Sequence, residues 1–244
     1  MAVPAEPLLE VISEASLTKI QDFLSQHLAN TVWALAVRSF QHPPLIQAIS
    51  SASLSNSNDL IAQELANTAW SFAKLLVCDE PLMTAIAAQA IKTIHDFTTQ
   101  ELSNTALAFA TLDVTNVPLF QAIASEAMAL IHNFTEQELA NTAWSLARIG
   151  LADVPLLESI SAEALRKMTE VSAQGLANLA WAYAKLLWHD RPLMAALSAA
   201  SIRHSQEFIP QGLTNLAWSW ATMAYCDFPL LDAIAAASVH RLSR

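Results

Sequence analysis

Glycine, cysteine and charged residues are scarce in this sequence. The 244 residues include three glycines and two cysteines, and Asp, Glu, Lys and Arg together make up 14% of the chain. With glycines only at positions 150, 175 and 212, there is no GxGxxG or Walker motif, so a glycine-rich phosphate-binding loop is excluded. The two cysteines, Cys78 and Cys226, lie 148 residues apart, which indicates buried or idle thiols in a reducing compartment and not a disulfide framework.

Targeting and membrane segments are lacking as well. The first residues, MAVPAEPLLEVISEAS, contain acids and no basic segment, so they are typical of neither a signal peptide nor an Arg-rich transit peptide. A long uncharged run, 210–226, contains Gln211 and Asn215 and aligns with more polar copies of itself, which argues against a membrane span. The net charge of −10 and the pI near 5.0 argue against binding of polyanions through bulk charge.

The sequence contains instead a repeat of 37 residues. The segment QELANTAWS occurs at 63–71 and again at 137–145, and a worn copy, QELSNTALA, occurs at 100–108. A Pro-Leu pair recurs at the same interval, starting at positions 7, 44, 81, 118, 155, 192 and 229. Because no repeat carries an insertion or deletion, we expect each unit to pack on its neighbour in the same way, as in an α-solenoid.

The repeat also predicts the domain organisation. We expect about six complete repeats plus a partial one, forming a single helical-repeat array over residues 1–244 without separate domains. The sequence begins and ends on the second helix of a unit, with no polar capping repeat at either end. We therefore also expect it to be a fragment of a longer protein.

Each unit is predicted to form two helices, which makes the fold all-α. In one unit the first helix should run from Gln63 to about Leu76, and the second should begin at Pro81. Capping-box spacings at 98–101 and 135–138 support helix starts there. An Asp stands two residues before the repeated proline in four units, at positions 79, 153, 190 and 227. Apolar residues recur at intervals of three and four rather than two, which excludes strands.

A helical wheel separates the first helix of this unit into two sides. The side predicted to be buried carries Leu65, Ala66, Ala69, Phe72, Ala73 and Leu76. The opposite side, predicted to be exposed, carries Glu64, Asn67, Ser71 and Lys74, with Trp70 at the border. Stacking such helices at the usual ~8–10 Å would place the asparagines of successive repeats in a row.

The exposed side supplies the candidate binding residues. The row of asparagines consists of Asn30, Asn67, Asn104, Asn141, Asn178 and Asn215. The basic and aromatic candidates beside it are Lys74, Arg148, Lys185, Trp70, Trp144 and Trp181, and Leu107 interrupts the tryptophans. Two interpretations are open for the asparagines, because the amides either brace neighbouring repeats or bind a polymer that runs along the array. Packing between repeats and stacking on a ligand are both open for the tryptophans.

The segment QELANTAWSFAKLL, followed by Pro81 at the start of a second helix, resembles the octotricopeptide repeat of organellar RNA-binding proteins. Related repeats occur beside RAP domains. The resemblance covers essentially the whole chain. The chain departs from the family pattern in two respects: its second helices begin with PLL, PLM or PLF rather than a Pro-rich, acidic, Trp-containing segment, and it contains no RAP domain.

The resemblance implies an α-solenoid that binds single-stranded RNA with sequence selectivity. It also implies a role in the processing, stability or translation of organellar transcripts, in a chloroplast or a mitochondrion. One base per repeat is compatible with helical repeats that present two or three side chains to each base. The acidic residues of the second helices, which we expect to face away from the asparagine row, include Glu10, Glu14, Glu126, Glu158 and Glu163.

A peptide-binding scaffold is the alternative function. The Asn and Trp rows resemble those of armadillo proteins, in which amides hold an extended peptide backbone and Trp rings receive its side chains. An acidic face would favour a basic peptide, so the placement of Glu64, Glu101 and Glu138 relative to the cations separates the two functions.

We expect neither an enzyme nor a cofactor or metal site. His95 and His132 occupy equivalent positions of two repeats, as do the two cysteines, so these residues are spread along the array and do not meet at one metal. The sequence has no HExxH, CxxC or GxSxG motif.

Overall fold

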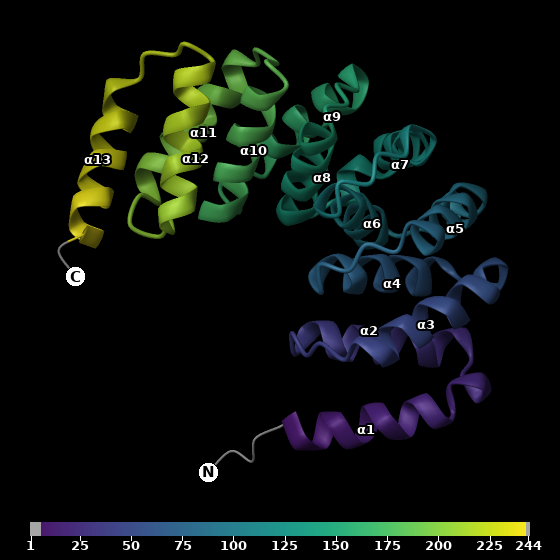
Figure 1. Ribbon diagram of the computed structural model, residues 1–244. Coiled ribbons are helices and arrows are strands. Elements are labelled where there is room, and N and C mark those ends of the chain that lie inside the picture. The colour runs from purple at the N-terminus through teal and green to yellow at the C-terminus, as the bar shows by residue number, and fades with distance from the viewer. Residues whose placement is uncertain (1–5, 243–244) are drawn as a thin grey trace. The chain divides into compact units, whose positions relative to one another are not determined.

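The computed structural model describes residues 6–242, and its regular structure over this range is entirely helical (Figure 1). The α-helices are α1 (Glu6–Thr18), α2 (Ser25–Val37), α3 (Pro43–Ser55), α4 (Ala62–Lys74), α5 (Glu80–Lys92), α6 (Thr99–Thr111), α7 (Val117–Leu130), α8 (Glu136–Ile149), α9 (Val154–Arg166), α10 (Ala173–Lys185), α11 (Arg191–Arg203), α12 (Pro210–Thr222) and α13 (Phe228–Leu242). Single 3-10 turns follow four of them, at η1 (Ile20–Asp22), η2 (Ser57–Asp59), η3 (Ile94–Asp96) and η4 (Ile131–Asn133). Residues 1–5, part of the N-terminal stretch compared above with targeting signals, lie outside the described range.

The predicted all-α solenoid architecture is confirmed, because neighbouring helices pack in series. We call the even-numbered helices α2 to α12 the first helices and the odd-numbered helices α1 to α13 the second helices. The chain divides into two compact units, Met1–Ile123 and Ala124–Arg244. No helix in the described part of the chain is long and apolar enough to cross a membrane.

Within each unit the first helices pack on one another more closely than the second helices do. In the first unit α4 lies between α2 and α6, and α3 lies between α1 and α5 (Figure 1). In the second unit α10 lies between α8 and α12, and α11 lies between α9 and α13. The close contact between first helices is possible because alanine, serine and threonine fill much of the surface between them.

Side-chain caps fix the starts of the helices. In the second helices Asp79, Asp153 and Asp190 each accept a hydrogen bond from the backbone N–H three residues later, at 3.1, 3.1 and 2.9 Å. The predicted capping boxes are confirmed at Thr98 and Thr135, where a glutamate three residues on accepts from the backbone N–H of the threonine at 2.7 and 2.9 Å. Helix α5 begins one residue before the expected proline, directly after its Asp cap.

Two assignments from the helical wheel are wrong. Leu76, expected in the core, is 77% exposed, because α4 ends at Lys74 and the chain turns away at this residue. Ser71, expected on the exposed side, is fully buried, and its hydroxyl donates to the backbone oxygen of Asn67 at 2.6 Å. Ser145 and Ser219 repeat this bond to Asn141 and Asn215, so the serine column belongs to the packed surface of the first helices.

A left-handed residue ends every first helix, a feature that the sequence pattern did not predict. The residues with positive φ are Ser39, Leu76, Asp113, Gly150, Leu187 and Ala224, which recur at the repeat interval. Only one of them is glycine, with φ at +74°. The conformation is therefore set by the repeat, which returns the chain from the first helix to the second, and not by a local glycine.

This column gives a test of backbone strain. A Cβ at Gly150 would meet no atom within 4 Å, so Gly150→Ala changes only the backbone preference. We expect Gly150→Ala to lower the free energy of unfolding by roughly 0.5–1 kcal/mol and Ala224→Gly to raise it by a similar amount. Urea denaturation followed by circular dichroism measures both, and a change of the same sign in the two variants would contradict this explanation.

Candidate functional site

The six asparagines of the predicted row lie on one exposed side of the first helices, which we call the ladder face. Asn30 is exposed, and the five asparagines that follow it at the repeat interval are half-buried. Within residues 6–242, no hydrogen bond joins any of these six side-chain amides to another protein group. The bracing interpretation therefore has no hydrogen bond to support it, and each amide keeps its donors and its acceptor available for a ligand.

The tryptophans line the same face, three residues after each asparagine. Trp33 and Trp218 are exposed, and Trp70, Trp144 and Trp181 are half-buried. In the second unit three of the rings contact one another in series. The ring centroids of Trp144 and Trp181 are 6.0 Å apart and those of Trp181 and Trp218 are 6.4 Å apart, with interplanar angles of 32° and 34°. The sequence predicted the row but not the ring contacts.

The charged residues lie at the two ends of the first helices. Lys74, Arg148 and Lys185 are exposed in the last turns, and no ion pair involving them occurs in the described part of the chain. Each acidic candidate lies at a helix start, where Glu64 accepts from the backbone N–H of Ile61 at 3.2 Å, as Glu101 and Glu138 do in their capping boxes.

Ten residues separate the capping glutamate from the lysine of α4, which is ~15 Å along a helix. The middle of the ladder face, where Asn and Trp lie, is uncharged in every first helix. Each capping glutamate lies about one turn before a ladder asparagine and is engaged with a backbone N–H, so the acidic groups nearest the asparagines belong to helix caps.

A buried carboxylate forms the strongest ionic cluster away from the ladder face. Glu163 lies on α9, a second helix, and is only 2% exposed. It accepts two hydrogen bonds from Arg166, at 3.1 and 3.0 Å, and lies 2.9 Å from His132 Nδ1 and 3.3 Å from Lys167 Nζ. The hydrogen bonds from Arg166, together with those from His132 and Lys167, lower the pKa of Glu163 to about 2 against the opposing effect of burial.

This cluster holds α9 against the preceding 3-10 turn and has no catalytic geometry. Lys167 Nζ also donates to the backbone oxygen of Phe134, at the end of η4. His132 and Lys167 therefore join the two segments, whereas Arg166 pairs with the carboxylate within α9. The role of the cluster is structural.

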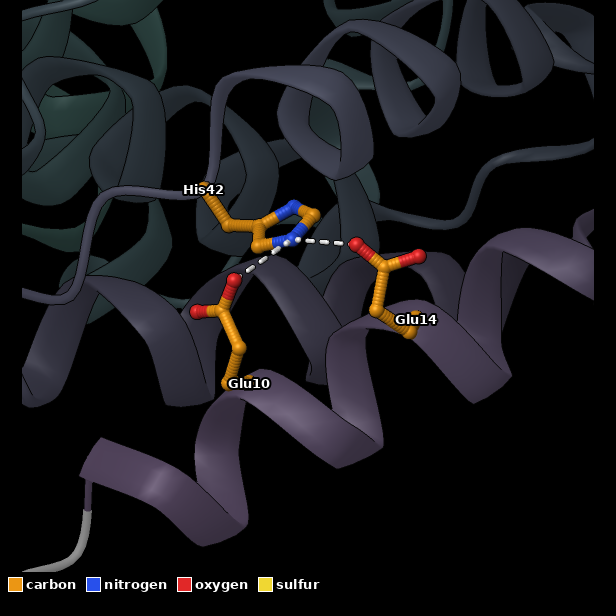
Figure 2. A group of neighbouring side chains, drawn as sticks. All are labelled: Glu10, Glu14 and His42. Atoms are coloured by element: carbon orange, nitrogen blue, oxygen red, sulfur yellow. Dashed lines mark ion pairs between the residues drawn. The ribbon is translucent and has the colours of Figure 1, made fainter.

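The one trio of side chains whose ligand atoms could converge on a metal, in the described part of the chain, is Glu10, Glu14 and His42 (Figure 2). His42 Nε2 lies 3.7 Å from Glu10 Oε1 and 3.4 Å from Glu14 Oε1. The other ring nitrogen, Nδ1, accepts the backbone N–H of Leu45 at 3.2 Å and so caps α3. A neutral imidazole with Nδ1 as acceptor carries its proton on Nε2, which then faces the two carboxylates and offers no lone pair to a metal.

A comparison of equivalent positions in the repeats shows that this pairing could have been predicted from the sequence. His42 occupies the cap position held elsewhere by Asp79, Asn116, Asp153, Asp190 and Asp227. The two positions equivalent to Glu10 and Glu14 are never both acidic in another repeat. Histidine thus replaces the acidic or amide cap in the one repeat where two carboxylates face it. This replacement avoids placing a third carboxylate beside Glu10 and Glu14, and we call it the electrostatic match.

A cavity of about 410 Å³ lies in the second unit, between the start of α11 and the end of α12. Its lining includes Arg191, Trp220, Tyr225 and Asp227. Asp227 already accepts from the backbone N–H of Leu230 and from the Ser198 hydroxyl, so its carboxylate is a cap and not a free base. The lining also includes Cys226, which like Cys78 is exposed and not buried, and among the described residues no hydrogen bond joins its thiol to a base.

The sequence resembles one described protein family over more than half of its length. The family model for the RNA-editing substrate-binding complex 6 protein matches residues 77–228, which contain α5 to α12. No curated protein matches the chain.

The Glu163 cluster predicts how stability depends on pH. Because the pKa of this carboxyl is about 2 in the folded chain and 4.5 ordinarily, its contribution is complete above pH 4.5 and is lost as the pH falls towards 2. We expect Glu163→Gln to lower the free energy of unfolding at pH 7 by on the order of 2 kcal/mol, with allowance for screening by solvent around the exposed partners.

Urea unfolding at several pH values measures this difference. The gap between the parent and Glu163→Gln should close below pH 4.5, and the matched control Glu158→Gln, an exposed residue of the same helix, should match the parent throughout. A gap that stays constant down to pH 2 would show that the carboxylate charge is not the cause.

The His42 pairing predicts a difference between two caps of similar shape. Asn116 caps α7 by accepting from the Leu119 N–H at 3.0 Å, so His42→Asn should preserve the cap. His42→Asp should also cap α3, but it places a third carboxylate near Glu10 and Glu14. In low salt, the free energy of unfolding of His42→Asp should be lower than that of His42→Asn by on the order of 1 kcal/mol. Equal stability of the two variants in low salt, or a difference that does not shrink in high salt, would refute the electrostatic match.

Proposed function

This chain belongs to the RNA-editing substrate-binding complex 6 protein family, and from that premise we propose that it is a non-enzymatic scaffold that binds single-stranded RNA with sequence selectivity. The family name refers to a complex that binds the substrates of RNA editing. The resemblance to octotricopeptide repeats supports the same RNA-related role and adds an organellar setting, in a chloroplast or a mitochondrion, to the proposal.

The row of asparagines is the observation that carries this proposal. In each unit three amides stand at the repeat interval on the same side of the first helices, accessible to solvent and without a protein partner in residues 6–242. An amide offers two donors and one acceptor, which suit the edges of unpaired bases and the hydroxyl groups of ribose. Such a row suits a polymer that presents one recognition group per monomer. Single-stranded RNA is such a polymer, because each nucleotide presents one base.

The charge distribution favours RNA over the alternative of a basic peptide. The glutamates of the first helices are engaged in caps, and the exposed cations Lys74, Arg148 and Lys185 lie at the opposite ends of the helices. If each cation neutralises one phosphate, the logarithm of the affinity should fall with the logarithm of salt with a slope of about −2. The proposed binding is therefore only weakly electrostatic, which fits an acidic chain.

The proposal assigns no catalytic step, cofactor or metal to this chain. Among residues 6–242 the clustered titratable groups are engaged in caps or in the ion pairs described above. An array of this kind acts by holding its ligand, and the chemistry of editing would belong to other components of a complex.

Selection from a random-sequence, single-stranded RNA pool at two salt concentrations tests the function. The purified chain should enrich particular sequences, with a salt slope near the value of about −2 given above. The variant Asn141→Ala/Asn178→Ala should remain folded by circular dichroism and lose the enrichment. Its affinity for the RNA should fall by about tenfold, because each hydrogen bond from a side-chain amide to a base contributes on the order of 1 kcal/mol.

The matched control is Asn58→Ala/Asn133→Ala, which removes two exposed amides that lie in 3-10 turns outside the ladder face. This control should retain the enrichment of the parent chain. Failure of the parent to enrich any RNA would overturn the proposal, and tight binding of a Lys-rich extended peptide in the same assay would favour the peptide-binding alternative. Equal enrichment by the Asn141→Ala/Asn178→Ala variant would remove the asparagines from the site.

A further inference from the structure

We infer that the ladder face of α8, α10 and α12 is where RNA is chiefly held, with Trp144, Trp181 and Trp218 forming a stacking platform for unpaired bases. This inference rests on the proposed function and adds the part of the array and the kind of contact that bind the strand.

The ring contacts set this part of the ladder face apart. Three indoles touch in series in the second unit, at centroid distances of 6.0 and 6.4 Å. In the described part of the first unit, no ring contact joins Trp33 to Trp70, and Leu107 replaces the third tryptophan. Among the described residues, the tryptophan rings therefore form a continuous surface along α8, α10 and α12 of the second unit and not within the first unit.

Rings that already pack on one another are prepared for a ligand. Each contacting indole has lost most of its rotamer freedom before RNA arrives, so less conformational entropy is lost on binding. The outermost ring of the series, Trp218, is 41% exposed, which leaves surface for a base. Base–aromatic stacking tolerates any base, so the tryptophans would supply affinity while the asparagines supply selectivity.

The spacing of the rings defines the form of RNA that fits. Successive bases in a stacked strand rise by ~3.4 Å, whereas the rings are separated by nearly twice that distance. A strand that places one base at each tryptophan must therefore be extended, with its own bases unstacked. Duplex RNA keeps its bases stacked and paired inside the helix and does not fit this platform.

Two of the three platform helices lack acidic residues. Helices α10 and α12 contain none, whereas α8 carries Glu136 and Glu138 in its first turn; in the first unit α4 and α6 each carry a capping glutamate and α2 carries none. Arg148 and Lys185 are exposed one turn beyond Trp144 and Trp181, with no ion pair in the described part of the chain, and are placed to meet phosphates.

The preceding turn packs closely on the starts of α10 and α12. Gly175 and Gly212 occupy the position of the capping glutamate in these helices. A Cβ on Gly175 would lie 2.9 Å from Val171 Cγ1, and one on Gly212 would lie 2.9 Å from Phe208 Cδ1, so a side chain at either position would require its neighbour to shift. Both helices therefore begin without an acidic cap.

The test compares one substitution in the two units of the full chain, with a fluorescently labelled random-sequence single-stranded RNA pool as the probe. Leu107 shows that leucine is accommodated in the tryptophan column, so Trp181→Leu and Trp70→Leu are matched variants. We expect Trp181→Leu to raise the Kd about tenfold and Trp70→Leu to raise it less than about twofold. The far-UV exciton signal of contacting indoles should fall in Trp181→Leu alone.

One further variant separates stacking from packing. Trp181→Phe keeps an aromatic face and should recover most of the affinity, whereas a packing role would be served as well by leucine. If Trp181→Leu loses helicity, the exposed pair Trp218→Leu and Trp33→Leu makes the same comparison.

Equal losses in the two units, or a larger loss for Trp70→Leu, would overturn this inference and leave the proposed function intact. The same holds if Phe gives no recovery over Leu, or if duplex RNA binds as well as the single strand. A parent chain that binds no RNA would instead overturn the proposed function, and this inference with it.

Discussion

The close contact between successive first helices is the constraint on which the other features of this protein depend. Ser71, Ser145 and Ser219 are fully buried, and the equivalent positions 108 and 182 are alanine. Side chains of this size let two helices approach closely, while a larger one would force them apart. The spacing between helices in turn sets the spacing of everything on the ladder face, including the ring contacts of Trp144, Trp181 and Trp218.

The turns preserve this spacing because they are built in the same way in each repeat. A left-handed residue closes every first helix, and a side chain at the next cap position starts the second helix, whether it is Asp79, Asn116 or His42. Five of the six left-handed residues are not glycine, so the packed helices on either side hold them in a conformation that they do not prefer. Local backbone preference is secondary here to the geometry of the repeat.

The caps also explain how an acidic chain can present a face that is not acidic. Glutamates at the starts of α4, α6 and α8 fold back onto backbone N–H groups, where the positive end of the helix dipole stabilises them. Glu163 is buried among cationic partners, and Glu10 and Glu14 face His42. The negative charge of the chain is thus largely placed where it serves the fold, and the net charge alone is a poor guide to the ligand.

The sequence by itself determined the repeat, the all-α fold, the helix caps and the row of asparagines, because each of these follows from spacing along one chain. It did not determine that Leu76 is exposed or that Ser71 is buried, since both depend on where a helix ends and on how its neighbour approaches. The ring contacts and the buried state of Glu163 were likewise decided by tertiary structure. Residues from different repeats meet only after packing, and the same tryptophan column gives touching rings in one unit and separate rings in the other. A helical wheel describes one helix, whereas burial and contact are properties of at least two.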